Sequence, residues 1–450
     1  MATPTSEEKQ KLRDIRRLCK LGALKPEQLD QFFVETEQAR DPHANLRMRL
    51  GEALEDGEDV HILVYGHGGS GKSTELVKLT EELDSEFFTV NFSVLDHLDI
   101  LSVTAAEILV IVAEQVIETA HATQLPIDDA LLQPIYEWFA KETVSLTDDV
   151  QSQLTAAAEA SIGTSYLSLL ARLMASIKGE LKLSTARTKS RVMQLSNSPR
   201  DLIDKINALL DSVRSALEVD QRLLIIVEDA DKLDIKTANQ VFVNDANLLT
   251  SINADIIYTI PLFTYYSPDS QVLRNKFGAY FSLPMIKVAD CIGQRFDEGF
   301  ETVRRIIRRR IPESGLTEEA ANLLIAKTGG VLQHVFEVIN TAAFMTDARV
   351  PLETEHIAYA LQRKKRELQG DITIPVGGIP GMEKAKVEDL FQRLAKHAKS
   401  QLQGEEGLLE NDPINQILLK TCALVEYNGK SWHGVHPLVQ DILRDLHLLD

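Results

Sequence analysis

Apolar residues along the 450-residue chain form two kinds of pattern, short continuous runs and helical repeats. Continuous runs of strand length occur at residues 60–65, 87–92, 223–227, 255–261 and, interrupted by a proline, 280–288. The run at 223–227 is entirely apolar, which is typical of a central strand buried on both faces of a parallel sheet. These runs predict an α/β protein with a central parallel sheet.

The N-terminal residues 5–40 show the spacing of two amphipathic helices. Thr5 and Glu8 have the spacing of a capping box, and Pro26 suits the first turn of the second helix. Phe32 and its two apolar neighbours follow. They either cover an adenine ring or dock a helix, and we favour docking.

Residues 93–221 are too many for a simple strand–helix–strand connection, which needs only about 30 residues. Helical repeats at 103–119, 127–142 and 202–217 therefore predict a large helical insertion. Within it, residues 166–183 are apolar along one side. That side could bind a membrane surface or a partner helix, but the few basic residues there favour packing within the insertion.

The C-terminal third is expected to be helical, with one small hairpin. Glycines at 329–330 divide a helical stretch, and the Gly- and Pro-containing residues 371–381 are expected to form a linker. The elements expected there are helices at 294–311, 317–348 and 384–401, a helix starting at Pro413, strands at 423–427 and 431–435, and a final helix at 437–448. Asn428-Gly429 between the two strands is a strong hairpin signal.

A glycine-rich loop directly follows the first strand and precedes a helix. It has the form G-x-x-x-x-G-K-S, whose backbone N–H groups cradle phosphates. Lys72 would reach the β- and γ-phosphates of ATP, and the Ser73 hydroxyl would hold Mg²⁺. The nucleotide-binding residues expected from this motif are Gly66, His67, Gly68, Gly69, Ser70, Gly71, Lys72, Ser73 and Thr74.

Acidic residues follow the apolar strand at 223–227. In P-loop enzymes this position holds Mg²⁺ and the attacking water. By register, Glu228 takes the place of the metal-side acid and Asp229 that of the general base. Asp231 is a third candidate for either role, and the sequence leaves open which of the three acids polarises water.

Two residues beyond the acidic segment complete the set of candidate catalytic residues. Thr259, near the end of the fourth strand, would touch the γ-phosphate or the lytic water; the alternative is a buried hydroxyl bonded to backbone. Arg274, shortly before the fifth strand, is a candidate arginine finger, although a solvated surface arginine is the favoured interpretation.

The composition limits the ligands, the cysteine chemistry and the cellular location that we expect for this protein. The net charge of −19 argues against indiscriminate binding to nucleic acid. The three cysteines match no zinc or disulfide spacing, and the longest aliphatic runs are far too short to span a membrane. The polar N-terminus has no apolar core of a signal peptide. We therefore expect a cytoplasmic protein.

The order of these features resembles the ASCE division of P-loop ATPases and, within it, AAA+ and STAND proteins. The closest likeness is to bacterial and archaeal STAND-type ATPases, through residues 66–76 and the acidic segment 227–233. The resemblance implies a sheet in which the Thr259 strand lies between the acidic strand and the P-loop strand. It also implies an N-terminal helical segment (1–45), an ATPase core (46–290), a helical lid (291–370) and a winged-helix-like module (371–450).

The resemblance implies an Mg²⁺- and ATP-dependent ATPase that acts as a conformational or oligomerisation switch. A role in signalling or antiviral defence, a separate protein partner and a homo-oligomer are expected with it. Two other classes stay open. One is a DNA-associated AAA+ ATPase using the arginines at 304–310, for which a salt-bridged helix face is the favoured alternative. The other is a nucleotide-binding scaffold that hydrolyses slowly. His334 stands where many such lids place an arginine.

Overall fold

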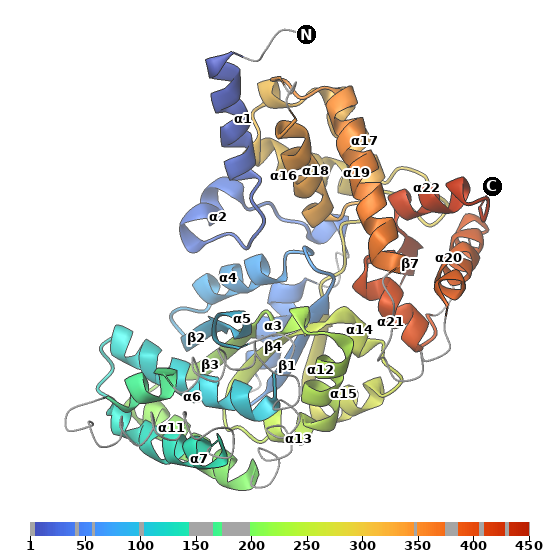
Figure 1. Cartoon of the computed structure of the whole chain (residues 1–450). Coiled ribbons are helices and arrows are strands. Elements are labelled where there is room, and N and C mark those ends of the chain that lie inside the picture. Colours follow the sequence, from blue (N-terminus) through green and yellow to red (C-terminus); the bar gives the residue numbers. More distant parts are fainter. Residues whose placement is uncertain are drawn as a thin grey trace.

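The computed structural model describes most of the chain. Its described residues are 5–40, 45–55, 59–98, 103–143, 165–172, 199–345, 349–373, 386–404, 409–427 and 432–449. An α/β core lies at the base of the view in Figure 1, a helical bundle lies above it, and the C-terminal elements lie to one side of both.

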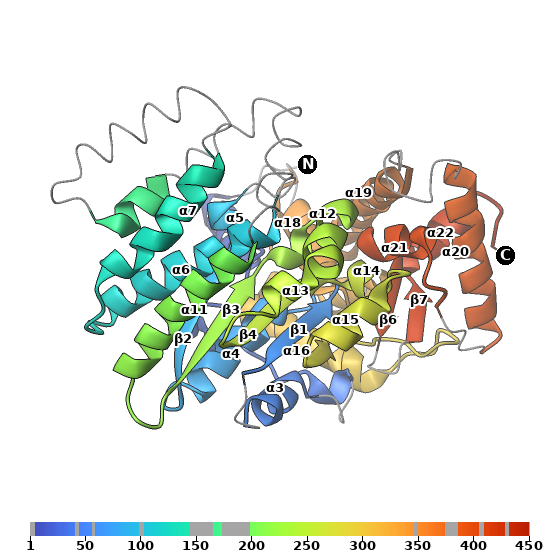
Figure 2. The ribbon, with the colours of Figure 1, turned by 90° about the horizontal axis from the view of Figure 1, so that it is seen from below.

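The core is built on a parallel sheet with the order β2-β3-β4-β1-β5. Its strands are β1 His61–Gly66, β2 Phe87–Ser93, β3 Arg222–Glu228, β4 Asp255–Pro261 and β5 Ala279–Ser282. Figure 2 shows β2, β3, β4 and β1 of this sheet in that order, seen from below. β4, which carries Thr259, lies between the acidic strand and the P-loop strand, so the expected order and the fold class are confirmed.

Both faces of the sheet are covered, because alternate side chains of each strand point to opposite faces. Ile62 and Val64 pack with α3 and α4, whereas Leu63 and Tyr65 face the larger hydrophobic cluster that includes α6 and α11. The helices of the core are α3 Leu46–Glu55, α4 Lys72–Glu82, α5 Val94–His97, α6 Ala105–Ala122, α7 Gln133–Thr143, α11 Pro199–Ala216, α12 Ile235–Asn239, α13 Ala246–Leu249, α14 Leu262–Tyr265 and α15 Ser270–Lys276.

The fifth strand is shorter than the sequence pattern predicts, and the expected end at residue 288 is wrong. β5 ends at Ser282, two residues before Pro284, which has no N–H to donate to a ladder. The next residue, Met285, donates its N–H to the carbonyl of Glu426 at 3.0 Å. The chain leaving the sheet therefore pairs with the C-terminal hairpin instead of continuing the strand.

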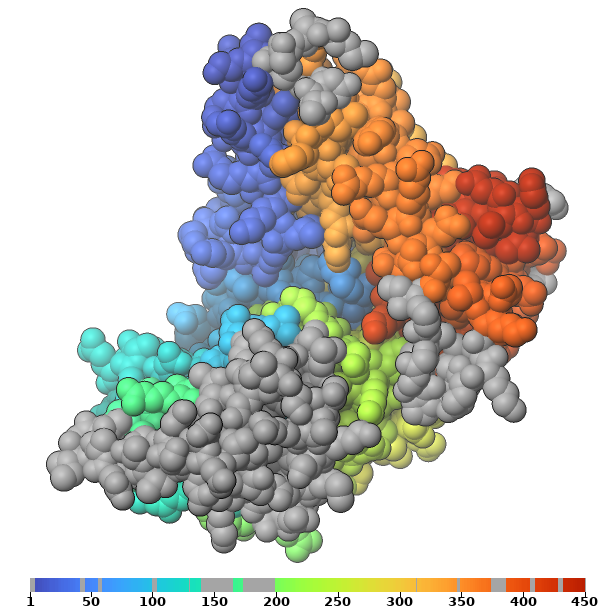
Figure 3. Space-filling model, in the orientation of Figure 1, coloured from blue at the N-terminus to red at the C-terminus, as the bar shows by residue number. Residues whose placement is uncertain are grey.

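Four helices form the bundle above the core: α16 Asp297–Arg310, α17 Glu318–Thr328, α18 Leu332–Ala343 and α19 Thr354–Thr373. The two N-terminal helices, α1 Ser6–Leu18 and α2 Pro26–Phe32, lie against this bundle (Figure 3). Arg309 and Arg310 of α16 donate to backbone carbonyls of the N-terminal helices, at Asp30, Gln31 and Leu18. Arginines at helix C-termini complement the partial negative charge there.

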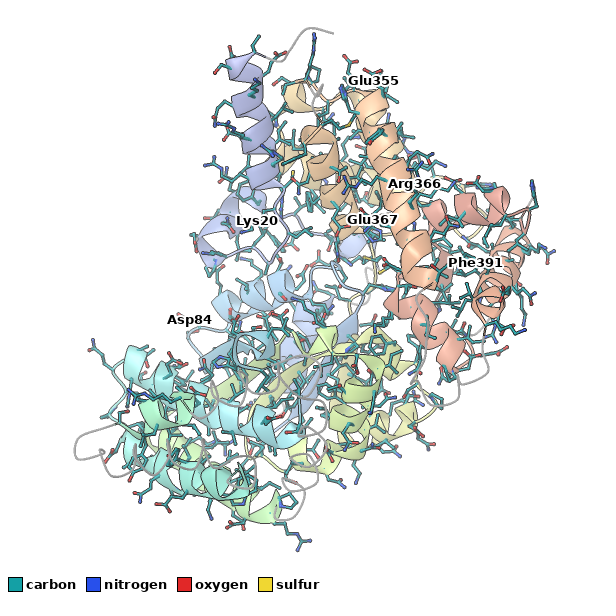
Figure 4. The ribbon with its side chains drawn as sticks, in the orientation of Figure 1. Lys20, Asp84, Glu355, Arg366, Glu367 and Phe391 are labelled. Carbon is teal, nitrogen blue, oxygen red and sulfur yellow. The ribbon has the colours of Figure 1, made fainter. Side chains whose placement is uncertain are left out.

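The expected helix caps and docking contacts of the N-terminal segment are present. Thr5 and Glu8 form the capping box, and Pro26 opens α2. Phe32 is buried with Leu24 and Leu29, so it docks a helix. Figure 4 shows Lys20, which follows α1, above Asp84, which follows α4. Because α2 contacts both α16 of the bundle and the P-loop helix α4, the N-terminal segment connects the two.

The C-terminal module, defined as α20 Val387–Leu402, α21 Pro413–Lys420, β6 Leu424–Tyr427, β7 Trp432–Val435 and α22 Pro437–Asp445, contains an antiparallel strand pair. The Asn428-Gly429 turn lies outside the described residues, as do residues 374–381 of the expected linker. Residues 371–373 still belong to α19, so the linker cannot start at 371.

The helical insertion is present as α6, α7, α11 and the helical residues 166–172. Residues 144–164 and 173–198, with the remainder of the expected apolar helix at 166–183, lie outside the described part. Among the described helices, none has both the length and the apolar character needed to cross a bilayer.

Candidate functional site

The glycine-rich loop connects β1 to α4 at the carboxyl edge of the sheet. Gly71 caps α4 with φ +103°, a left-handed conformation that L residues rarely adopt. Gly69 has φ +75°, and a Cβ built on it would lie 2.4 Å from the Cβ of Gln333 at the start of α18. The backbone there is therefore compatible only with glycine.

Lys72 is buried at the centre of this loop. Its ammonium group donates to the carbonyls of Gly66 and His67, each at 3.0 Å. It also forms an ion pair with Asp231, with 2.7 Å between Nζ and Oδ2. The lysine expected to meet phosphate is thus held by the loop itself and by one acid after β3.

The hydroxyls of Ser70, Ser73 and Thr74 have different surroundings. Ser70 Oγ is buried and makes no hydrogen bond to any other described residue. The Ser73 hydroxyl lies on the side of Glu228, the acid expected on the metal side, and favours the ionised form of that carboxyl, which lowers its pKa. Thr74 lies farther out and accepts a hydrogen bond from the N–H of Leu24 at 3.2 Å, so it contacts the N-terminal segment.

Glu228 ends β3 and is nearly buried. Burial raises the pKa of its carboxyl above the usual value, while hydrogen bonds from Ser73 and Asn91 act in the opposite direction. Asn91 Nδ2 donates to Oε1 of Glu228 at 2.9 Å. The structure therefore brings Ser73 and Glu228, the two residues expected to hold magnesium, to the same side of the P-loop.

Asp229, the expected general base, is in a left-handed conformation with φ +65°. Strained backbone of this kind is concentrated at functional sites. Its carboxylate accepts from the Ser93 hydroxyl at 2.6 Å and pairs with Lys232 at 2.6 Å. Asp231 instead faces Lys72, so the two aspartates have separate partners.

The other two candidate catalytic residues lie elsewhere. Thr259 is buried in β4, and its hydroxyl donates to the carbonyl of Val227 at 3.3 Å, which is the structural alternative weighed above. Arg274 lies on the exposed side of α15, with its guanidinium 5.8 Å from the centre of the Tyr265 ring. Neither residue makes a described contact with the P-loop.

A buried arginine that the motif search missed supports the outer side of the P-loop. Arg40 donates to the carbonyl of Ser70 at 2.6 Å, to Thr36 Oγ1 at 2.9 Å and to the carbonyl of Pro284. Burial lowers its pKa to about 10, so the guanidinium stays charged at neutral pH. No sequence spacing links Arg40 to residue 70, so its role depends on tertiary contacts.

The side chain of His67 extends from the P-loop into the C-terminal module. Its Nε2 accepts the backbone N–H of Glu426 at 2.9 Å, and Nδ1 lies 3.6 Å from Cys422 Sγ. Burial lowers the pKa of His67 to about 3, so the ring is neutral and Nε2 is free to accept. His67 therefore joins the P-loop to the module.

The buried carboxylate of Glu426 extends this junction. It accepts from the Tyr266 hydroxyl at 2.8 Å and from the Ser282 hydroxyl at 2.5 Å. Nearby, His334 Nδ1 lies 3.1 Å from His436 Nε2, which links α18 to the start of α22. The P-loop, the sheet, the bundle and the C-terminal module meet at this one place.

Polar residues of β2 are the second group that the sequence interpretation left out. Asn91 and Ser93 contact Glu228 and Asp229 because β2 and β3 are neighbours, with Ser93 opposite Glu228. Their position at the end of a predicted strand could have marked them once the strand order was known.

The glycine loop, the lysine and the acidic strand end, placed on this strand order, define a P-loop nucleoside triphosphatase fold. Residues 46–257, somewhat less than half of the chain, match the KAP family P-loop domain. No curated protein sequence matches the chain.

Several solved structures match the chain over nearly its whole length at low identity. A Walker-type ATPase of Pyrococcus abyssi is 15% identical, with 95% of this chain and 99% of that chain covered and a TM-score of 0.43. Cdc6p from Pyrobaculum aerophilum is 13% identical, with 99% of this chain and 98% of that chain covered and a TM-score of 0.36. The ORC1 protein of Aeropyrum pernix, solved in complex with DNA, is 13% identical, with 96% of each chain covered and a TM-score of 0.37.

The two neighbouring glycines of the loop should respond differently to alanine. Gly69→Ala should lower the thermal unfolding midpoint, because its Cβ would clash with Gln333 and its φ is left-handed. Gly68→Ala is the control, since its Cβ would meet only Gln333 Oε1, at 3.5 Å. Equal midpoints for the two variants, measured without nucleotide, would contradict the contact between the loop and α18.

Proposed function

We propose that this protein binds and hydrolyses Mg²⁺–ATP and uses the reaction as a conformational switch. The observation that carries the proposal is the arrangement around Lys72 and Ser73, where Lys72 forms an ion pair with Asp231 and the Ser73 hydroxyl acts on the carboxyl of Glu228. These are the residue types that P-loop enzymes use to hold a triphosphate and its metal.

The site fits both groups on structural grounds. The loop has a backbone conformation that requires glycine, and Ser70 Oγ is buried there without a described partner. Gly66 to Thr74 would hold the phosphates, and Ser73 with Glu228 would hold Mg²⁺, which neutralises phosphate charge when bound. Asp229 or Asp231 would take the proton from the attacking water.

The contacts between the P-loop and three other parts of the chain support the proposed switch. Arg40, His67 and Gln333 tie it to the N-terminal segment, the C-terminal module and α18. A phosphate bound at Lys72 would compete with the carbonyls of Gly66 and His67 for the same ammonium group. Binding of the triphosphate would therefore change the loop at the residue that holds the C-terminal module, and the module would shift in response.

A partner protein, an oligomer and a role in signalling or defence extend this proposal and rest on the likeness of residues 66–76 to STAND-type loops. A DNA-associated function has less support. Arg304 pairs with Glu318 at 3.1 Å, and Arg309 and Arg310 donate to carbonyls of the N-terminal helices. These arginines are occupied within the chain, which agrees with the salt-bridged alternative.

Replacement of the P-loop lysine tests the proposal directly. Lys72→Ala should abolish ATP binding measured by isothermal titration, because the charged group that reaches the phosphates is removed. Lys78→Ala, on the same helix α4 but in weak surface pairs, should bind like the wild type. If Lys72→Ala bound ATP as tightly as the wild type, the assignment of this site would be wrong.

The hydrogen bond from Asn91 should set the pH range of metal-dependent binding. The pKa of Glu228 is already raised by burial, so its ionised form is lost as pH falls through that raised value. Asn91→Leu removes a bond that favours the carboxylate and should raise this pKa further. Mg²⁺-dependent nucleotide affinity should then decline at a higher pH than in the wild type.

The matched control is Thr89→Val on the same strand. Thr89 Oγ1 is buried and makes no hydrogen bond to another described residue, so its removal should leave the pH midpoint unchanged. Titrations between pH 5 and 8 would show the difference. A common midpoint for wild type, Asn91→Leu and Thr89→Val would mean that Glu228 does not control metal binding.

A further inference from the structure

The three acids after β3 are divided among different partners. Glu228 accepts a hydrogen bond from Asn91, whereas Asp229 accepts one from Ser93 and pairs with Lys232. Asp231 alone is paired with the P-loop lysine. Both side chains of that pair are nearly enclosed, with exposed fractions of 5% for Lys72 and 11% for Asp231.

The position of Asp231 is set by the local backbone. Residues Ala230–Lys232 form a single 3₁₀ turn after the left-handed Asp229. That turn directs the Lys232 side chain to Asp229 and leaves the Asp231 carboxylate on the side of Lys72. The lysine is fixed in turn by the carbonyls of Gly66 and His67. The carboxylate therefore meets an ammonium group with little freedom to move away.

We propose that Asp231 is a specificity-determining residue that makes the site prefer a nucleoside diphosphate over a triphosphate. The inference rests on the proposed function, because it requires that the P-loop binds nucleotide. The P-loop lysine contacts the β- and γ-phosphates of a bound triphosphate. A carboxylate 2.7 Å from its Nζ lies beside the region that the γ-phosphate would enter.

The electrostatic consequence differs between the two ligands. A diphosphate can share Lys72 with Asp231 by taking the place of the Gly66 carbonyl, because the three donors of the ammonium group then serve two anions and the His67 carbonyl. A triphosphate brings additional negative charge beside Asp231 in a nearly enclosed site. Like charges a few ångströms apart repel strongly where water is largely excluded. Triphosphate binding must therefore displace Asp231 from Lys72, whereas diphosphate binding need not.

This discrimination gives the switch a resting state. With a diphosphate bound, the Lys72–Asp231 pair and the contact of Lys72 with the His67 carbonyl both persist. The His67 side chain then stays in the C-terminal module. A triphosphate would exchange these partners of Lys72 for its own oxygens. Asp231 thereby couples the number of phosphates on the nucleotide to the contact between His67 and the C-terminal module.

The test measures the affinities of the full chain for ADP and for a non-hydrolysable ATP analogue by titration. Asp231→Asn keeps the shape of the side chain and removes its charge, and Asp231→Ser is a second neutral variant. Asp231→Glu retains the charge. Asp220→Asn, at an exposed turn before β3, is the matched control for the loss of one negative charge. Each titration is run with Mg²⁺ and with a chelator.

Asp231→Asn and Asp231→Ser should increase the ratio of triphosphate to diphosphate affinity by about tenfold, with and without Mg²⁺. Asp231→Glu and Asp220→Asn should keep the wild-type ratio. An unchanged ratio in both neutral variants would overturn the inference, as would a loss of triphosphate affinity seen only with Mg²⁺, which would make Asp231 a metal ligand. If the wild type bound neither nucleotide, the proposed function itself would fail, so the two failures are distinguishable.

Discussion

The conformation of the P-loop, and of the parts of the chain that contact it, depends on the hydrogen bonds of Lys72. A buried ammonium group needs acceptors, and here it has the carbonyls of Gly66 and His67 and the carboxylate of Asp231. Each acceptor belongs to a different functional part: the start of the P-loop, the residue that reaches the C-terminal module, and the acidic strand end. In this account a triphosphate that binds Lys72 competes with all three acceptors, whereas a diphosphate displaces only the Gly66 carbonyl.

Residues from distant parts of the chain bind the polar groups on the outer side of the P-loop and pack against its backbone. Arg40 binds the Ser70 carbonyl, and Gln333 packs on Gly69. Glu426 donates its N–H to His67. Buried polar groups without partners are costly, so these contacts hold the loop in one conformation. The same contacts make the N-terminal segment, the bundle and the C-terminal module sensitive to any change in the loop.

Local patterns were sufficient to predict the strands of the core, apart from the end of β5, and the helix that follows the P-loop, but not the short helices α3, α5, α12, α13 and α14. The P-loop follows from its glycine spacing, and β3 follows from a continuous apolar run that ends in acids. The position of β4 between β1 and β3 came from a family resemblance, since strand order leaves no local mark. The contacts of Arg40 and His67 join residues 30 to 359 positions apart and could not be predicted from spacing. The end of β5 was mistaken because the segment after Pro284 pairs with β6, far away in sequence.

Amide hydrogen exchange tests most directly whether a bound triphosphate loosens the C-terminal module from the P-loop. The amides to follow are those of α21 and β6, including the Glu426 N–H that His67 accepts. Exchange in these elements should become faster with Mg²⁺ and a non-hydrolysable ATP analogue, and should stay slow with ADP. Equal or slower exchange with the triphosphate analogue, at concentrations where its binding is demonstrated, would contradict the claim.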